Sequence, residues 1–136
     1  NRARYYEVLQ QVRTEGNWEG WLTFYLEGVD RVAGEAGRTA KAIIGLFDRH
    51  HRMIQGLGKA AGSALGVHDL LKQSGIISLP KVCRSLKVSF PTANKAMANL
   101  QRLGIVKEFT GKERHRVFSY DPYVKIIAEG THLETP

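Results

Sequence analysis

The sequence is poor in cysteine and proline, and it has no long hydrophobic run. Of its 136 residues, one is cysteine and four are proline. The single thiol, Cys83, can form neither an internal disulfide nor a zinc site by itself. No apolar run reaches the roughly 18 residues that a membrane-spanning helix needs. These shortages argue against a disulfide-stapled domain and a membrane partner, and they favour a protein of the reducing cytoplasm.

The positive charge of the chain is concentrated in its second half. The whole sequence has a formal net charge of +7. Residues 66–128 contain eleven Lys and Arg against four Asp and Glu, whereas residues 1–65 contain nine against seven. Concentrated positive charge favours polyanions, because a neutralised phosphate releases its counterions. The alternative is a basic surface that only keeps the protein soluble.

Residues 1–55 have apolar residues at helical spacing. One helix is expected over residues 3–14, and Asn17 can cap a second helix that begins at Trp18. This second stretch is one long helix, or two helices with a kink near Gly34 and Gly37. We expect its apolar stripe to be core, covered by the remainder of a longer chain or by a second copy. The stripe comprises Trp18, Trp21, Leu22, Tyr25, Val29, Val32, Ala40, Ile43, Ile44 and Phe47.

A glycine-rich stretch over residues 56–64 is expected to be a linker. Its glycines lack the spacing of a phosphate-binding loop, so they predict no nucleotide site. The next helix is expected from about Leu65 to Ser74, where Gly75 ends it. Residues 65–130 would then form one domain, and residues 131–136 would be a tail.

Two short helices with a tight turn between them follow. Each begins with a serine cap and has a proline in its first turn, where a missing N–H costs nothing. The caps are Ser78 and Ser89, and Gly104 ends the second helix. The residues expected to face inward are Leu79, Val82, Cys83, Leu86, Ala93, Ala96, Met97, Leu100 and Leu103.

Two strands with a basic turn between them complete the domain. They are expected over Ile105–Phe109 and Arg116–Tyr120, and Asp121-Pro122 starts a terminal helix over residues 122–129. A short strand is also expected at Ile76-Ile77. The fold class is therefore mainly α: a helical N-terminal segment, then a winged helix-turn-helix with a three-helix core and a small β-hairpin wing.

A helix-turn-helix of this kind is typical of nucleic-acid binding. The N-terminal residues of its second helix meet base edges, so that Asn94 could pair with adenine and Lys95 with guanine or phosphate. The basic turn could follow a phosphate backbone or enter a minor groove. The alternative is that the tip of the hairpin is merely polar and solvated. The candidate DNA contacts are Ser89, Phe90, Thr92, Asn94, Lys95, Asn99 and Arg102 on the helix, and Lys112, Arg114, His115 and Arg116 on the wing.

No catalytic, metal or cofactor site is predicted for this segment. His50 and His51 are adjacent on a helix, so they point to different faces and cannot easily share a metal. His68 and His115 have no ligand set near them in the sequence. No Ser-His-Asp or Cys-His arrangement can be assigned from the spacing.

Several segments resemble the C-terminal region of bacterial Fic (filamentation induced by cAMP) proteins. The winged-helix part is carried by Ser89-Phe90-Pro91-Thr92-Ala93-Asn94-Lys95-Ala96, Leu103-Gly104-Ile105-Val106, Thr110-Gly111-Lys112 and Arg116-Val117-Phe118. The upstream part, Arg2-Ala3-Arg4-Tyr5-Tyr6 with Val12-Arg13 and Trp18-Glu19-Gly20-Trp21-Leu22, resembles the end of the Fic helical domain. The chain starts at Asn1 without a methionine, so a fragment of a longer protein is expected.

The resemblance implies a winged-helix appendage, not an active enzyme. Fic enzymes of this kind transfer AMP from ATP to a protein hydroxyl with a His-x-Phe loop that runs into Gly-Asn-Gly-Arg. This sequence lacks that signature, so no catalytic residue is carried over. The implied function is transcription-regulatory DNA binding, with double-stranded DNA, the remainder of a Fic parent chain or a homodimer as partners. Phe90 stands where many similar DNA-reading helices carry Arg, which leaves a protein-interaction or autoregulatory module as the alternative.

Overall fold

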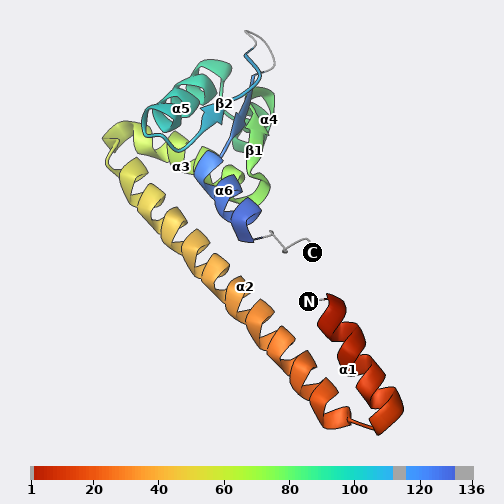
Figure 1. The fold of residues 1–136 in the computed structure, drawn as a ribbon. Helices are drawn as coiled ribbons and strands as arrows, with labels where there is room; N and C mark the ends of the chain where they lie inside the picture. The colour runs from red at the N-terminus through yellow and green to blue at the C-terminus, as the bar shows by residue number, and fades with distance from the viewer. Residues whose placement is uncertain (1, 112–115, 131–136) are drawn as a thin grey trace.

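A long helical hairpin leads into a small winged-helix domain (Figure 1). The computed structural model describes residues 2–111 and 116–130. Helix α1 (Arg2–Glu15) packs antiparallel against the first part of α2 (Trp18–Gln55). The Asn17 side chain caps α2, because its Oδ1 accepts a hydrogen bond of 2.9 Å from the Gly20 N–H.

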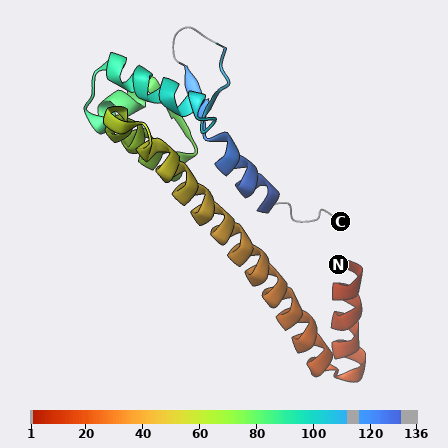
Figure 2. The same ribbon diagram turned by 90° about the vertical axis from the view of Figure 1, so that its left-hand side faces the viewer.

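Helix α2 is continuous through both of its central glycines. Its 38 residues correspond to a length of about 57 Å at 1.5 Å per residue. The structure therefore selects the single-helix alternative over a kink at Gly34 and Gly37. Figure 2 shows that the helix carries α1 at one end and the winged helix at the other.

The second half of the chain is a winged helix-turn-helix, which confirms the expected fold class. Its three strands form an antiparallel sheet in the order β1-β3-β2, with Ile77 and Glu108 both paired to Phe118. The elements are a 3-10 turn η1 (Gly58–Ala60), α3 (Ala61–Ser74), β1 (Ile76–Ser78), α4 (Leu79–Leu86), α5 (Phe90–Arg102), β2 (Lys107–Glu108), β3 (Val117–Ser119) and α6 (Asp121–Gly130).

Some expected boundaries were wrong. Helix α3 begins at Ala61, not Leu65, so much of the glycine-rich stretch 56–64 is helical. Gly66 serves close packing: a Cβ atom there would lie 3.1 Å from the Leu86 Cδ1 atom on α4. The wing strands are shorter than expected, because Ile105 and Val106 are buried ahead of β2 without ladder pairing. Gly75 ends α3 as predicted, with a left-handed φ of 67°.

One hydrophobic core joins the winged helix to the end of α2. Leu46 and Ile54 are the buried apolar residues that α2 contributes. Helix α6 packs along the same end of α2. The core contributed by the winged helix includes Val67, Leu71, Ile77, Leu79, Val82, Ala93, Ala96, Met97, Leu100, Ile105, Phe118 and Tyr120.

The N-terminal stripe of α2 is not core within the described chain, which corrects the sequence-based expectation. The Trp18 side chain is 63% exposed and the Tyr25 side chain 58%. Helix α1 covers only a neighbouring face, where the Tyr5 ring contacts Trp21 and Phe24. Periodicity predicted the stripe correctly, but it could not say whether this chain supplies the surface that covers it.

Candidate nucleic-acid interface

The N-terminal tip of α5 is fixed by its cap and by its inner face. Ser89 adopts an extended backbone, and its Oγ accepts a hydrogen bond from the Thr92 N–H at 3.5 Å. The Ser89 and Thr92 hydroxyl oxygens also lie 2.9 Å apart. Ala93 and Ala96 are buried where α5 packs on the core, and α3 and α4 are its main helical neighbours. The opposite side of the helix is therefore presented outward.

The expected base-reading side chains lie on this outward side. Phe90 is 56% exposed, and Thr92, Asn94 and Lys95 are exposed as well. Arg102 is also exposed, near the other end of the helix. Figure 1 shows α5 at the end of the molecule remote from α1. No other described element of the chain seals the tip of α5.

Asn99 is the exception among the predicted contacts on this helix. Its side chain is only 7% exposed, so the expectation that it faces outward was wrong. Its Oδ1 atom accepts a hydrogen bond of 2.6 Å from the Arg102 guanidinium. Asn99 lies beside Leu100 in the sequence, and α5 turns both of these residues toward the core. Its direct contribution is to hold Arg102.

The base of the wing is a hydrogen-bonded turn. The Glu108 carboxylate accepts the backbone N–H groups of Thr110 and Gly111 at 3.1 and 3.0 Å, and it also accepts the Thr110 hydroxyl. The hydroxyl hydrogen bond is the main cause of a lowered Glu108 pKa. Arg116 lies with its guanidinium carbon 5.0 Å from the centre of the Phe118 ring. The other predicted wing contacts, Lys112, Arg114 and His115, lie outside the described residues.

Three further cations precede α5, and the sequence analysis did not single them out. Lys81 and Arg84 are exposed on α4, and Lys87 is exposed in the turn. Lys87 has a left-handed φ of 53°, and its N–H bonds to the Cys83 carbonyl. The signal available in the sequence was their three-residue spacing, which places cations on the side of the helix away from the buried Val82. They add three exposed cations close in sequence to the start of α5.

Two histidines and a tyrosine form a buried polar cluster where α2, α3 and the junction of β3 and α6 meet. The Tyr120 hydroxyl lies 2.7 Å from His50 Nδ1 and 3.0 Å from His68 Nε2. The Phe47 ring stacks on Tyr120 and meets the edge of His68. Sequence reasoning left both histidines without partners, since 70 and 52 residues separate them from Tyr120.

Burial sets the protonation of this cluster. Desolvation, together with the nearby Lys72 charge, lowers the pKa of His68 to about 4. Desolvation and the Arg49 charge lower the pKa of His50, and burial raises that of Tyr120. Both imidazoles are therefore neutral near pH 7. In the part of the chain that the structure describes, no three His, Cys, Asp or Glu side chains gather to hold a metal ion.

No protein-family model matches the sequence, and no curated protein matches it significantly. Among residues 2–111 and 116–130, no helix has both the length and the apolar character needed to cross a membrane.

Proposed function

We propose that this chain is a winged-helix DNA-binding module with a transcription-regulatory role. The observation that carries the proposal is the outward tip of α5, which directly follows the Ser89 cap. Four side chains are exposed there: Phe90, Thr92, Asn94 and Lys95. A helix-turn-helix places the corresponding tip of its second helix in the major groove of duplex DNA. The net charge of +7 supplies the nonspecific part of the affinity.

Each exposed side chain at the tip has a chemical partner on DNA. The Asn94 amide can form two hydrogen bonds with the edge of an adenine, and Lys95 can donate to guanine or phosphate. The Thr92 methyl and the Phe90 ring can contact a thymine methyl. The positive end of the α5 helix dipole favours a phosphate there.

Phosphate contacts would orient the helix in the groove. In this fold the first helix of the pair crosses the DNA backbone, and here that helix is α4, with Lys81, Arg84 and then Lys87 exposed. Arg102 and Arg116 would contact phosphates beside the groove. The wing cations Lys112, Arg114 and His115 belong to the same proposal.

We further propose that this module is the C-terminal region of a Fic-type protein. The support is the resemblance of the α5, wing and hairpin segments to that family. Because the Fic catalytic signature is absent from the sequence, the proposed role is not enzymatic and requires no cofactor. The helical hairpin would then dock on the remainder of a Fic-type chain or on a second copy.

Alanine substitutions at Asn94 and Lys95 test the DNA proposal. A duplex selected from a random library would be titrated against the wild type and the two single variants. Loss of a bidentate base contact costs about 1–3 kcal/mol of discrimination, so affinity for the selected site should fall at least about fivefold. Lys41→Ala, an exposed lysine on α2, is the control and should change nothing. Unchanged affinity in both tip variants would refute the proposed readout.

A second candidate function is a protein-interaction or autoregulatory module on the same fold. The observation that favours it is Phe90, a large apolar side chain 56% exposed at the tip of α5. In this case Phe90→Ala should abolish binding of a protein partner and leave DNA affinity intact. Loss of DNA binding alone would count against this alternative.

A further inference from the structure

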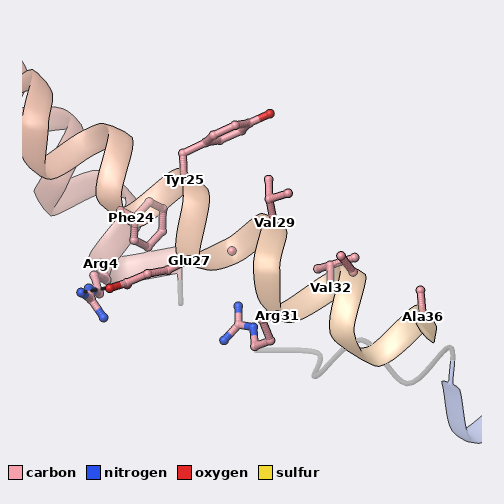
Figure 3. A pocket seen from close by; sticks show the side chains of 10 residues that line it. Arg4, Phe24, Tyr25, Glu27, Val29, Arg31, Val32 and Ala36 are labelled. Atoms are coloured by element: carbon pink, nitrogen blue, oxygen red, sulfur yellow. Dashed lines mark ion pairs between the residues drawn. The ribbon is translucent and has the colours of Figure 1, made fainter. Parts of the chain in front are cut away.

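An apolar seam along the N-terminal part of α2 is uncovered in the described chain. The seam consists of Trp18, Leu22, Tyr25, Val29, Val32 and Ala36, all of which are exposed. Successive members are alternately four and three residues apart, which is the heptad spacing of helices that pack along a common line. Figure 3 shows the last four of these side chains projecting from one side of α2, while Glu27 and Arg31 lie elsewhere around it.

The same seam continues into the winged-helix half, where this chain covers it. Continuing the spacing beyond Ala36 gives Thr39, Ile43, Leu46 and His50, of which the last two are buried. Helix α6 runs antiparallel to α2 along this part (Figures 1 and 2) and ends at Gly130, against the Thr39 side chain. The uncovered seam therefore begins where the α6 helix stops, and its geometry suits another antiparallel helix.

We propose that the α2 seam of a second copy fills this place, antiparallel to the first. A two-fold axis that crosses α2 at the level of Glu27 relates the two antiparallel helices. It sets each bulky side chain opposite a smaller one. Trp18 faces Ala36 of the second copy, Leu22 faces Val32, and Tyr25 faces Val29. A parallel pair would instead set Trp18 against Trp18 and leave a gap between two alanines, which packs poorly.

The exposed area is close to what a stable interface needs. The seam residues and the adjoining Leu26, which is 61% exposed, present on the order of 600–700 Å², given roughly 150–250 Å² for a whole aromatic side chain and less for Leu, Val and Ala. A stable protein–protein interface buries about 800 Å² on each partner. The two hairpins together would form a four-helix arrangement with the α2 helices at its centre.

The charges beside the seam permit this pairing. One flank of the seam is the side away from α1. The residues beside the seam on this open flank are Leu26, Ala33 and Ala40, which are uncharged, and Glu19 at the N-terminal end of α2. The other flank carries α1, and there an Arg4–Glu27 ion pair of 3.7 Å joins the two helices of the hairpin. No row of like charges therefore opposes a second copy on the open side.

The proposal fixes where the two winged helices lie. Leu46 is 19 residues from the two-fold axis at Glu27, so the two Leu46 residues would be separated by about 57 Å along the helices. The winged helices would lie at opposite ends of the dimer. Since the seam lies on α2, the dimer does not depend on the proposed DNA binding.

Sedimentation equilibrium of the full chain tests whether the seam binds a second copy. The wild type should be a dimer at micromolar concentration. Leu22→Glu with Val29→Glu places charges in the interface and should weaken dimerisation at least about 100-fold. Circular dichroism should be unchanged, because both side chains are already about half exposed. Ile44→Glu is the matched control: Ile44 is 61% exposed on the same helix, outside the seam, and its variant should remain dimeric.

Cysteine cross-linking tests the antiparallel register. In a Cys83→Ser background, Leu22→Cys and Val32→Cys chains should form a disulfide-linked dimer when mixed, and neither should cross-link alone. Self-cross-linking of Leu22→Cys would overturn the antiparallel arrangement. A wild type that stays monomeric at concentrations on the order of 100 μM, where even weak dimers populate, would overturn the dimer itself. The seam would then belong to another segment of a longer chain or to another protein.

Discussion

The His50 Nδ1 atom lies 2.7 Å from the hydroxyl oxygen of Tyr120, which fastens the last turns of α2 to the junction of β3 and α6. The same hydroxyl meets His68 Nε2 on α3 at 3.0 Å. One hydroxyl has one proton, so it donates to one imidazole and accepts from the other. We assign donation to His50 and acceptance from His68. This leaves an unpaired lone pair, rather than an unpaired N–H, on the buried His68 Nδ1.

Removal of the Tyr120 hydroxyl should destabilise the whole fold. Tyr120→Phe keeps the ring but leaves two buried imidazole nitrogens without a partner, at a cost of about 2–3 kcal/mol. Urea denaturation should show a lower midpoint with an unchanged slope. Tyr123→Phe is the control, because the Tyr123 ring also packs on Phe47 and no hydrogen bond of its hydroxyl is found among the described residues. Equal midpoints for the two variants would contradict the role of the Tyr120 hydroxyl.

Stability should fall as the pH drops below about 6.5. The pKa of His68 is about 4 in the folded chain, against an ordinary value of 6.5, and the pKa of His50 is lowered as well. Between these values the unfolded chain binds more protons than the folded one. Stability is thus fully present above pH 6.5 and is lost toward pH 4, by up to about 1.4 kcal/mol per pH unit for each histidine.

Urea titrations at pH 7, 6 and 5 measure this dependence, in a range where carboxylates contribute little. His68→Gln should be less stable at pH 7 and should lose part of the slope. His51→Gln should change the slope less than His68→Gln does, because the hydrogen bonds of the Tyr120 hydroxyl go to His50 and His68. A wild-type stability that stays flat between pH 7 and 5 would show that the two imidazoles are not buried in the neutral form.

The Ser89 cap should matter more than the Ser78 cap. Both serines precede a helix with a proline in its first turn, but only the Ser89 side chain accepts a hydrogen bond at its helix start. Ser89→Ala should cost about 0.5–1 kcal/mol, at the lower end for a cap because the bond is 3.5 Å long. Ser78→Ala should cost less than this in the same thermal or urea measurement. The reverse order would contradict the assignment of the cap to Ser89.

The parts of this fold that the sequence predicted are those that depend on interactions between neighbouring residues. The Ser89 cap, the prolines in the first turns of α4 and α5 and the stop at Gly75 act within a few residues, so the helix-turn-helix could be placed closely. The start of α3 was misplaced because glycine spacing resembles a linker. In the structure, Gly66 instead permits a close approach to Leu86, which no local pattern reveals.

Long-range contacts account for what the sequence did not predict. The cluster of His50, His68 and Tyr120 joins three elements that only the tertiary fold brings together. Asn99 was expected on the outward face because only the apolar residues of this helix were assigned inward, but α5 buries it and its amide oxygen is paired with Arg102. The stripe of α2 is exposed in the described chain, and periodicity alone could not say whether this chain covers it.

The salt dependence of duplex DNA affinity tests the central proposal most directly. If one copy neutralises about four phosphates, log affinity should fall against log salt with a slope near −3 to −4. Substituting Lys112, Arg114 and Arg116 together with alanine should flatten that slope while the fold remains intact. An affinity that ignores salt, or a slope that the triple substitution leaves unchanged, would contradict the account of α5 and the wing as a DNA-binding surface.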